Sequence, residues 1–389
     1  MELADIFRQH GPTYREAWKD RLPPNHYRVM RSIELCRTAE LGGHAQACDN
    51  CEHRQIAYNS CRNRHCPKCQ GLARARWLEA RQAELLPVEY FHVVFTVPEI
   101  IAQLALSNKK VLYSLLFQAT SETLLTIGAD PKHLGADLGF LAVLHTWGQN
   151  LMHHPHLHCI IPGGGLLADG AGWKPCRKGF FLPVRVLSRM FRGKFLHGVQ
   201  QLYHQGKLVF PGALARHADA QGFGALLRQA RETDWVVYAK RPFGGPDQVL
   251  AYLGRYTHRV AISNQRLLSL SNGQVTFSWK DYRTGQARKT MTLPAHEFIR
   301  RFMVHVLPKS LVRIRYFGFL GNRVRRTKLE ECRRSLNVQQ SPEPGQAPTS
   351  EEVLTRLLGR HPDRCPECER GMLIRLDPQR PGRPGPNTS

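Results

Sequence analysis

The alternation of apolar and polar positions predicts several β-strands between residues 90 and 242. Four segments are rich in β-branched and aromatic residues, as strands are. They are YFHVVFTVP (90–98), FLAVLHTWG (140–148), HLHCIIPG (156–163) and WVVYAKRP (235–242). Helical spacing marks the stretch after the first strand, 100–128, and the stretch after the last, 246–262. The order β-α-β-β-insertion-β-α predicts an α+β fold in which a small antiparallel sheet carries helices on one face.

The regions before and after this core are also predicted to form helices and strands. Residues 1–40 have apolar residues at helical spacing, interrupted by Pro23 and Pro24. Residues 71–87 alternate Leu or Trp with Arg, which indicates a basic helix ended by proline. Residues 267–293 predict hairpin strands with a turn at Asn272-Gly273.

The excess of positive charge indicates that the chain binds a polyanion. The 389 residues hold 55 Lys and Arg against 31 Asp and Glu, a formal charge of +24. Such an excess favours nucleic acid as the partner, although it also fits simple solubility or attraction to an anionic membrane surface. The chain has no apolar run of 18 residues, a polar start, and no G-x-x-x-x-G-K-[ST] motif. We therefore expect a cytoplasmic protein without membrane contact or nucleotide cofactor.

The cysteines indicate metal binding rather than disulfides. Their number is odd, eleven, and two Cys-x-x-Cys pairs lie close together near the N-terminus. Four thiolates, Cys48, Cys51, Cys66 and Cys69, are predicted to hold one structural Zn²⁺, with Cys61 and His65 as spare ligands. Basic residues surround them, and we expect Arg62, Arg64 and Lys68 to contact phosphates.

A third pair, Cys365 and Cys368, makes half a zinc site. It would need Cys332, His361 or another chain to be completed, and an unmetallated pair is an equal alternative.

Two further pairs of residues suggest chemistry on phosphates. On a strand, His156 and His158 project from the same face while Leu157 points to the opposite, apolar side, so both imidazoles can bind one divalent ion. On a helix, Tyr252 and Tyr256 lie one turn apart on one face. Beside the tyrosines lie His258 and two arginines, Arg255 and Arg259, which we expect to contact DNA. Each pair alone also fits a structural role: a satisfied polar strand edge for the histidines, and a packed aromatic face for the tyrosines.

Taken together, the motifs give a specific resemblance. The segments CDNCEHRQIAYNSCRNRHCPKCQ, LHTWGQNLMHHPHLHCIIPGGG, AYLGRYTHRVAISNQRL and RYFGFLGNR resemble those of HUH (His-hydrophobic-His) single-strand endonucleases with two tyrosines. The chain is most similar to transposases of the insertion-sequence-91 family, which move by a rolling-circle route. The resemblance spans nearly the whole chain. It implies an HUH core with an RRM-like palm, preceded by a small zinc-binding domain.

The resemblance also implies a mechanism. A divalent ion, Mg²⁺ or Mn²⁺, on His156 and His158 would polarise the scissile phosphate, and Tyr252 or Tyr256 would form a 5′-phosphotyrosine ester with single-stranded DNA. A third metal ligand is expected: His145 is the first choice because its strand should neighbour that of His156, with Gln149 and His258 in reserve. Host helicase or replication proteins would supply the single strand near the bacterial nucleoid.

These expectations divide the chain into three parts. A helical and zinc-binding domain is predicted at 1–86, a catalytic domain at 87–330, and a linker with the last Cys pair and a disordered tail at 331–389. A rolling-circle replication initiator or relaxase would share the nicking chemistry. A zinc-containing DNA-binding regulator would need neither the histidine pair nor the tyrosine pair.

Overall fold

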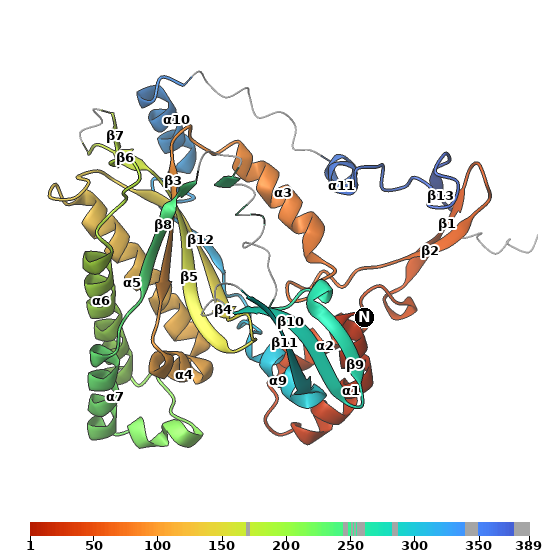
Figure 1. Cartoon of the computed structure of the whole chain (residues 1–389), viewed down its shortest axis with the longest axis horizontal. Coiled ribbons are helices and arrows are strands. Elements are labelled where there is room, and N and C mark those ends of the chain that lie inside the picture. Colours follow the sequence, from red (N-terminus) through yellow and green to blue (C-terminus); the bar gives the residue numbers. More distant parts are fainter. Residues whose placement is uncertain are drawn as a thin grey trace, which may run out of the picture.

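A five-stranded antiparallel sheet forms the centre of the molecule (Figure 1). The computed structural model describes residues 1–168, 172–243, 248, 249, 252, 254, 261–281, 287–338 and 349–376. The strands follow the order β12-β4-β5-β3-β8. Their bounds are β3 (Tyr90–Thr96), β4 (Gly139–Trp147), β5 (His153–Pro162), β8 (Val237–Phe243) and β12 (Ile314–Gly318). The four strands predicted from the sequence are all present, and the α+β fold is confirmed.

One face of this sheet is buried by the main layer of helices. These are α4 (Glu99–Ser107), α5 (Lys109–Ala129), α6 (Val184–His204) and α7 (Ala220–Glu232). Figure 1 shows α5, α6 and α7 along the same side of the sheet. Phe95, Phe140 and Leu157 point into this layer and are fully buried. The predicted insertion between the third and fourth strands contributes α6 and α7, whose apolar faces complete this core.

The opposite face of the sheet is covered in part as well, which the prediction of helices on one face omitted. Here α3 (Gln70–Gln82) packs Trp77 and Leu78 against a small apolar cluster. Val143, Ile160 and Tyr252 belong to that cluster. A Cβ added to Gly254 would lie 2.9 Å from Leu78 Cδ1, so α3 closely approaches Gly254, two residues from Tyr252.

A second core, outside the central sheet, joins the N-terminal helices to residues 267–304. It holds α1 (Leu3–Ala17), α2 (Pro24–Glu34), β9 (Leu267–Ser271), β10 (Gln274–Asp281), β11 (Ala287–Pro294) and α9 (Ala295–Val304). The second helix begins at Pro24 with Pro23 as its N-cap, so the two prolines mark the predicted break between the first two helices. Asn272 and Gly273 have φ values of 49° and 69°, which confirms the two-residue hairpin turn between β9 and β10.

The C-terminal segment lies on the N-terminal hairpin. β1 (Gly43–Cys48) pairs with β2 (Arg54–Tyr58) on one edge and with β13 (Leu373–Arg375) on the other, and Figure 1 shows this sheet apart from the central one. The domain boundaries stay a prediction, but the last Cys pair belongs spatially to the first domain. The residues 341–348 of the predicted linker and the predicted disordered tail, 378–389, lie outside the described residues.

The remaining elements are short or peripheral. They are β6 (Gly164–Leu166), β7 (Trp173–Pro175), α10 (Arg325–Ser335), α11 (Ser350–Leu358), and the 3₁₀ turns η1 (Ala39–Leu41), η2 (Gly212–His217) and η3 (Asn264–Arg266). Among the helices of the described residues, none is both long and apolar enough to cross a bilayer.

Candidate active site and metal centres

Three histidines meet on the face of the sheet opposite the main helical layer. β4 and β5 are neighbours, and His145 pairs directly with His156 in their register. The prediction that these two residues lie on adjacent strands is therefore confirmed. The ring nitrogens of His145, His156 and His158 include three atoms that all lie within 4.8 Å of one another. Three imidazoles at this separation can bind one cation.

The local electrostatics keep His156 in the form that binds metal. Burial lowers the pKa of His156 to about 3, so its imidazole is neutral at pH 7. Its Nδ1–H donates to the carbonyl of His154 at 2.6 Å, which leaves the Nε2 lone pair free of the proton. This Nε2 lies 3.1 Å from His158 Nε2. The two side chains therefore present their Nε2 atoms to the same point.

Tyr252 approaches the same histidine from the other side. Its hydroxyl lies 3.2 Å from Nδ1 of His158 and 2.7 Å from Nε2 of His92, and the phenol is 8% exposed. The Nε2 atom of His158 thus faces the other metal-site histidine, and its Nδ1 faces both the phenol and His92. The predicted nucleophile and the predicted metal ligands share one site.

His92 was missed in the sequence analysis. It stands in the middle of the apolar strand β3, two residues from Val94, and Val94 pairs with His158. Residues two apart share a face of a strand, so His92 lies on the histidine face. It is 1% exposed and its Nε2 lies 2.8 Å from His158 Nδ1. The one available signal was a single polar residue in an otherwise apolar strand.

Several predicted site residues lie outside the described residues. These are Tyr256, Arg255, His258 and Arg259. Gln149, a reserve metal ligand, is described and lies in the turn between β4 and β5, where its backbone carbonyl accepts a hydrogen bond from Arg266. In the described chain, the third histidine grouped with His156 and His158 is His145, the first choice for the third ligand.

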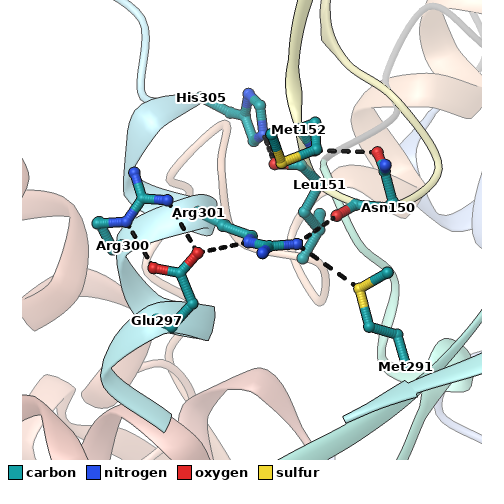
Figure 2. Close-up of polar contacts among 8 residues, drawn as sticks. All are labelled: Asn150, Leu151, Met152, Met291, Glu297, Arg300, Arg301 and His305. Atoms are coloured by element: carbon teal, nitrogen blue, oxygen red, sulfur yellow. Dashed lines mark hydrogen bonds and ion pairs between the residues drawn. The ribbon is translucent and has the colours of Figure 1, made fainter. Parts of the chain in front are cut away.

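The turn that precedes the histidine strand is held by α9 (Figure 2). Arg301 donates to the carbonyl of Asn150 at 3.4 Å while Glu297 holds its guanidinium at 2.6 Å. His305, which directly follows α9, donates from Nε2 to the carbonyl of Leu151 at 3.0 Å. Leu151 has a φ of 61°, an uncommon conformation for a branched residue that these contacts stabilise. The second core therefore fixes the ends of the strands that carry His145 and His156.

The predicted zinc site is wrong in its grouping. Cys48 and Cys51 do not join Cys66 and Cys69. The structure forms two separate groups of four thiols, Cys36, Cys61, Cys66, Cys69 and Cys48, Cys51, Cys365, Cys368. The sequence spacing suggested that neighbouring pairs combine, but the β1-β2 hairpin carries the first pair away from the second. His65, proposed as a spare, is in neither group of the described chain.

The first of these groups fits a structural zinc ion by donor type and spacing. Cys69 Sγ lies 3.4 Å from Cys36 Sγ and 3.5 Å from Cys61 Sγ. Tetrahedral Zn²⁺ with sulfur at its usual bond length places neighbouring sulfurs about 3.8 Å apart. Cys61 is therefore a member of the group rather than a spare.

Among the three basic residues beside the cysteines that were predicted to contact DNA, two have their charged ends occupied by the protein. Arg64 donates to the carbonyls of Leu311 and Pro308 at 2.8 and 2.9 Å. Lys68 forms an ion pair with Glu2 at 2.5 Å. Arg62 is exposed, which makes it the best placed of the three for a phosphate.

Comparisons with known proteins agree along the chain. A family model described as "Putative transposase" matches residues 139–328, and one described as "Transposase zinc-binding domain" matches residues 6–97. The chain is 56% identical over 379 residues to the "Putative transposase y4qJ" of Sinorhizobium fredii (strain NBRC 101917 / NGR234), covering 97% of this chain and 95% of that one. It is 30% identical over 310 residues to the "Transposase for insertion sequence element IS801" of Pseudomonas savastanoi pv. phaseolicola, covering 76% and 72%.

Among solved structures, the chain is similar to the conjugative relaxase TrwC in complex with OriT DNA, in its metal-bound form. The identity is 12%, the match covers 65% of this chain and 74% of that chain, and the TM-score is 0.25. At that score the two chains differ too much in arrangement for details to carry over. The family models and the close relatives decide the matter: the chain belongs to the insertion-sequence-91 family of transposases.

Proposed function

We propose that this transposase cuts and rejoins single-stranded DNA with Tyr252 as a nucleophile and a divalent cation on His145, His156 and His158. The observation that supports this most directly is the position of His158. One of its nitrogens faces His156 Nε2 at 3.1 Å and the other faces the Tyr252 hydroxyl at 3.2 Å. A phosphate bound at the cation would therefore lie beside the phenol.

The residues fit a divalent cation by their chemistry. Neutral imidazoles leave the full charge of the ion available to polarise a phosphate, which is the chemistry that the ion supplies when bound. Imidazole suits Mn²⁺ better than Mg²⁺, which prefers oxygen ligands. We therefore expect Mn²⁺ to support the reaction at lower concentration than Mg²⁺.

His92 is the proposed acceptor of the tyrosine proton. An unperturbed phenol has a pKa near ~10 and is a weak nucleophile at pH 7. When His158 binds a cation through Nε2, its Nδ1 carries a proton and donates, so the Tyr252 O–H must donate elsewhere. His92 Nε2, at 2.7 Å, is placed to accept it.

The proposed step transfers the scissile phosphate from a 3′ oxygen to Tyr252. Tyr252 Oη forms a bond to phosphorus and its proton passes to His92, while the bond from phosphorus to the 3′ oxygen breaks and that oxygen takes a proton from solvent. The product is a 5′-phosphotyrosine ester and a 3′ hydroxyl. Attack of a 3′ hydroxyl on the ester reverses the step and joins strands without ATP. Tyr256 is proposed as the second nucleophile, and host helicase or replication proteins as the source of the single strand.

A denaturing gel tests the proposal. The full chain is incubated with Mn²⁺ or Mg²⁺ and labelled single strands from the ends of its element, and a covalent protein–DNA band is sought. Tyr252→Phe and Tyr256→Phe should each weaken cleavage or joining, and the double variant should give no adduct. Tyr203→Phe is the matched control, because Tyr203 also loses one hydrogen bond, to the carbonyl of Ala218 in the helical layer. An adduct in the double variant would refute the assignment, and single-strand binding without any adduct in the wild type would favour a non-catalytic DNA-binding protein.

A further inference from the structure

We propose that the chain binds two structural zinc ions, and that the second is held jointly by the N-terminal hairpin and the C-terminal segment. Its ligands are the thiols of Cys48, Cys51, Cys365 and Cys368. The zinc-binding family model ends at residue 97, so it does not contain the last two cysteines. The site follows from side chains that lie together in space, and it does not depend on the proposed nicking chemistry.

The sulfur geometry fits a tetrahedral ion. Cys48 Sγ lies 3.7 Å from Cys368 Sγ, and Cys51 Sγ lies 3.7 Å from Cys365 Sγ. All four sulfurs lie within 4.8 Å of one another. Tetrahedral zinc requires about 3.8 Å between sulfurs, whereas a disulfide requires about 2.05 Å. The four cysteines are free of disulfides. Two Cys-x-x-Cys units facing each other are the usual ligand set of a closed structural zinc site.

Backbone amides support the thiolates on both sides. The N–H of Asn50 points to Cys48 Sγ, and the N–H of Gly371 points to Cys368 Sγ, each at 3.4 Å. Donors directed at sulfur stabilise its negative charge, as in other metal-bound thiolates. Both halves of the site therefore have the same supporting arrangement although they come from distant parts of the chain.

Strand pairing holds the two halves in register. β13 pairs with β1 so that Leu373 stands opposite Cys48. The Asp49 carboxylate accepts from the N–H of Met372 at 2.8 Å, and the Asp49 N–H donates to the Met372 carbonyl at 3.1 Å. At Gly371 the approach is so close that an added Cβ would lie 2.5 Å from Cys48 Sγ. Strand pairing and the Asp49 contacts thus hold the two cysteine pairs next to each other.

A second zinc ion would link the N-terminal hairpin to the C-terminal segment. A zinc ion at this site links residues 314 positions apart, Cys51 and Cys365, and holds the C-terminal segment on the hairpin. Loss of the site should release that segment without unfolding the catalytic sheet, since the sheet has its own core.

Metal counting tests the proposal. Full-length protein is washed with a mild chelator, and zinc per chain is measured by inductively coupled plasma mass spectrometry. We expect two zinc ions in the wild type, one in the Cys365→Ser/Cys368→Ser variant, and two in the Cys176→Ser control, whose cysteine lies outside both groups. Cys368→His, which keeps a zinc ligand, should retain two. One zinc ion in the wild type, or two in the double serine variant, overturns the proposal.

Cobalt substitution gives a second readout if the serine variant folds poorly. Co²⁺ in four-thiolate sites has a sulfur-to-metal charge-transfer band, and its intensity per chain should fall by half in Cys365→Ser/Cys368→Ser and be kept in Cys176→Ser. Unchanged intensity in the double variant contradicts the proposal. Neither measurement uses DNA cleavage, so a failure of the nicking mechanism leaves the result interpretable.

Discussion

His158 links the two parts of the proposed active site, because it can bind a cation with one nitrogen while its other nitrogen lies within hydrogen-bond distance of the nucleophile. This arrangement couples metal binding to the hydrogen bonding of Tyr252. A cation on Nε2 fixes the proton on Nδ1, so of the two imidazole nitrogens near the phenol only His92 Nε2 can accept its hydrogen.

The role of His92 gives the first prediction at this scale. His92→Ala should slow adduct formation by roughly 100-fold or more at neutral pH, as for loss of a general base, and added imidazole should restore part of the rate. The rate should also rise more steeply with pH than in the wild type, since hydroxide must then take the proton. Single-turnover gels across a pH series measure both effects. His133→Ala is the control. A slow variant with an unchanged pH profile and no imidazole rescue would mean that His92 only packs the site.

Metal binding at His156 gives the second prediction. His156→Ala removes one of three proposed ligands, so the concentration of Mn²⁺ needed for half-maximal adduct formation should rise by about 10–100-fold, with partial recovery at high Mn²⁺. Titration of adduct yield against Mn²⁺ in the wild type, His156→Ala and His133→Ala measures this. An unchanged Mn²⁺ requirement would remove His156 from the ligand set.

At the scale of elements, the sequence predicted the site residues whose positions depend on strand alternation and on the pairing of consecutive strands. Strand alternation predicted that His156 and His158 share a face and that Leu157 enters the core, and both are found. The position of His145 followed from the expected pairing of consecutive strands. His92 could not be found in this way, because its strand joins the site through the pairing of β3 with β5, and one histidine in an apolar strand fits ordinary burial equally well.

The contact between α9 and the β4-β5 turn leads to a stability prediction. Burial lowers the pKa of His305 to about 3, below its ordinary value of 6.5. As pH falls from 6.5 towards 3, the unfolded chain takes up a proton there and the folded chain does not, so stability decreases. At pH 5 this residue alone should lower the free energy of unfolding by up to ~2 kcal/mol relative to pH 7.

Urea denaturation of the zinc-containing protein, without added Mn²⁺ or Mg²⁺, at pH 7 and pH 5 measures this effect. His305→Gln should be less stable than the wild type at pH 7, because it alters the hydrogen bonds to Leu151 and Thr146. Its further loss on going to pH 5 should be smaller than that of the wild type by up to ~2 kcal/mol. The exposed His197→Gln on α6 should lose as much as the wild type. Equal pH dependence in all three proteins would contradict the assignment.

At the scale of the whole molecule, the sequence predicted the kind of metal site but not its pairing. Spacing along the chain identifies Cys-x-x-Cys units, yet which units meet depends on the path of the β1-β2 hairpin and on the return of the C-terminal segment. The same limit explains why Arg64 was expected at DNA: its carbonyl partners, Leu311 and Pro308, lie more than 240 positions away. Long-range contacts of this kind leave no local pattern.

The net charge of +24 leads to the last prediction, which concerns DNA binding by the full chain. Phosphate contacts release counterions, so affinity for single strands should fall linearly with the logarithm of salt concentration, with a slope near −6 if ~8 phosphates are neutralised. Arg62→Ala should reduce the size of this slope by about 0.7, since it removes the proposed contact between one phosphate and the exposed Arg62. The slopes are measured by fluorescence anisotropy with a labelled oligonucleotide. Salt is varied from about 50 to 300 mM, where the loss of affinity is large enough to measure. Arg228→Ala, on α7 in the helical layer behind the sheet, should leave the slope unchanged. An affinity insensitive to salt would show that the positive charge serves solubility rather than nucleic acid binding.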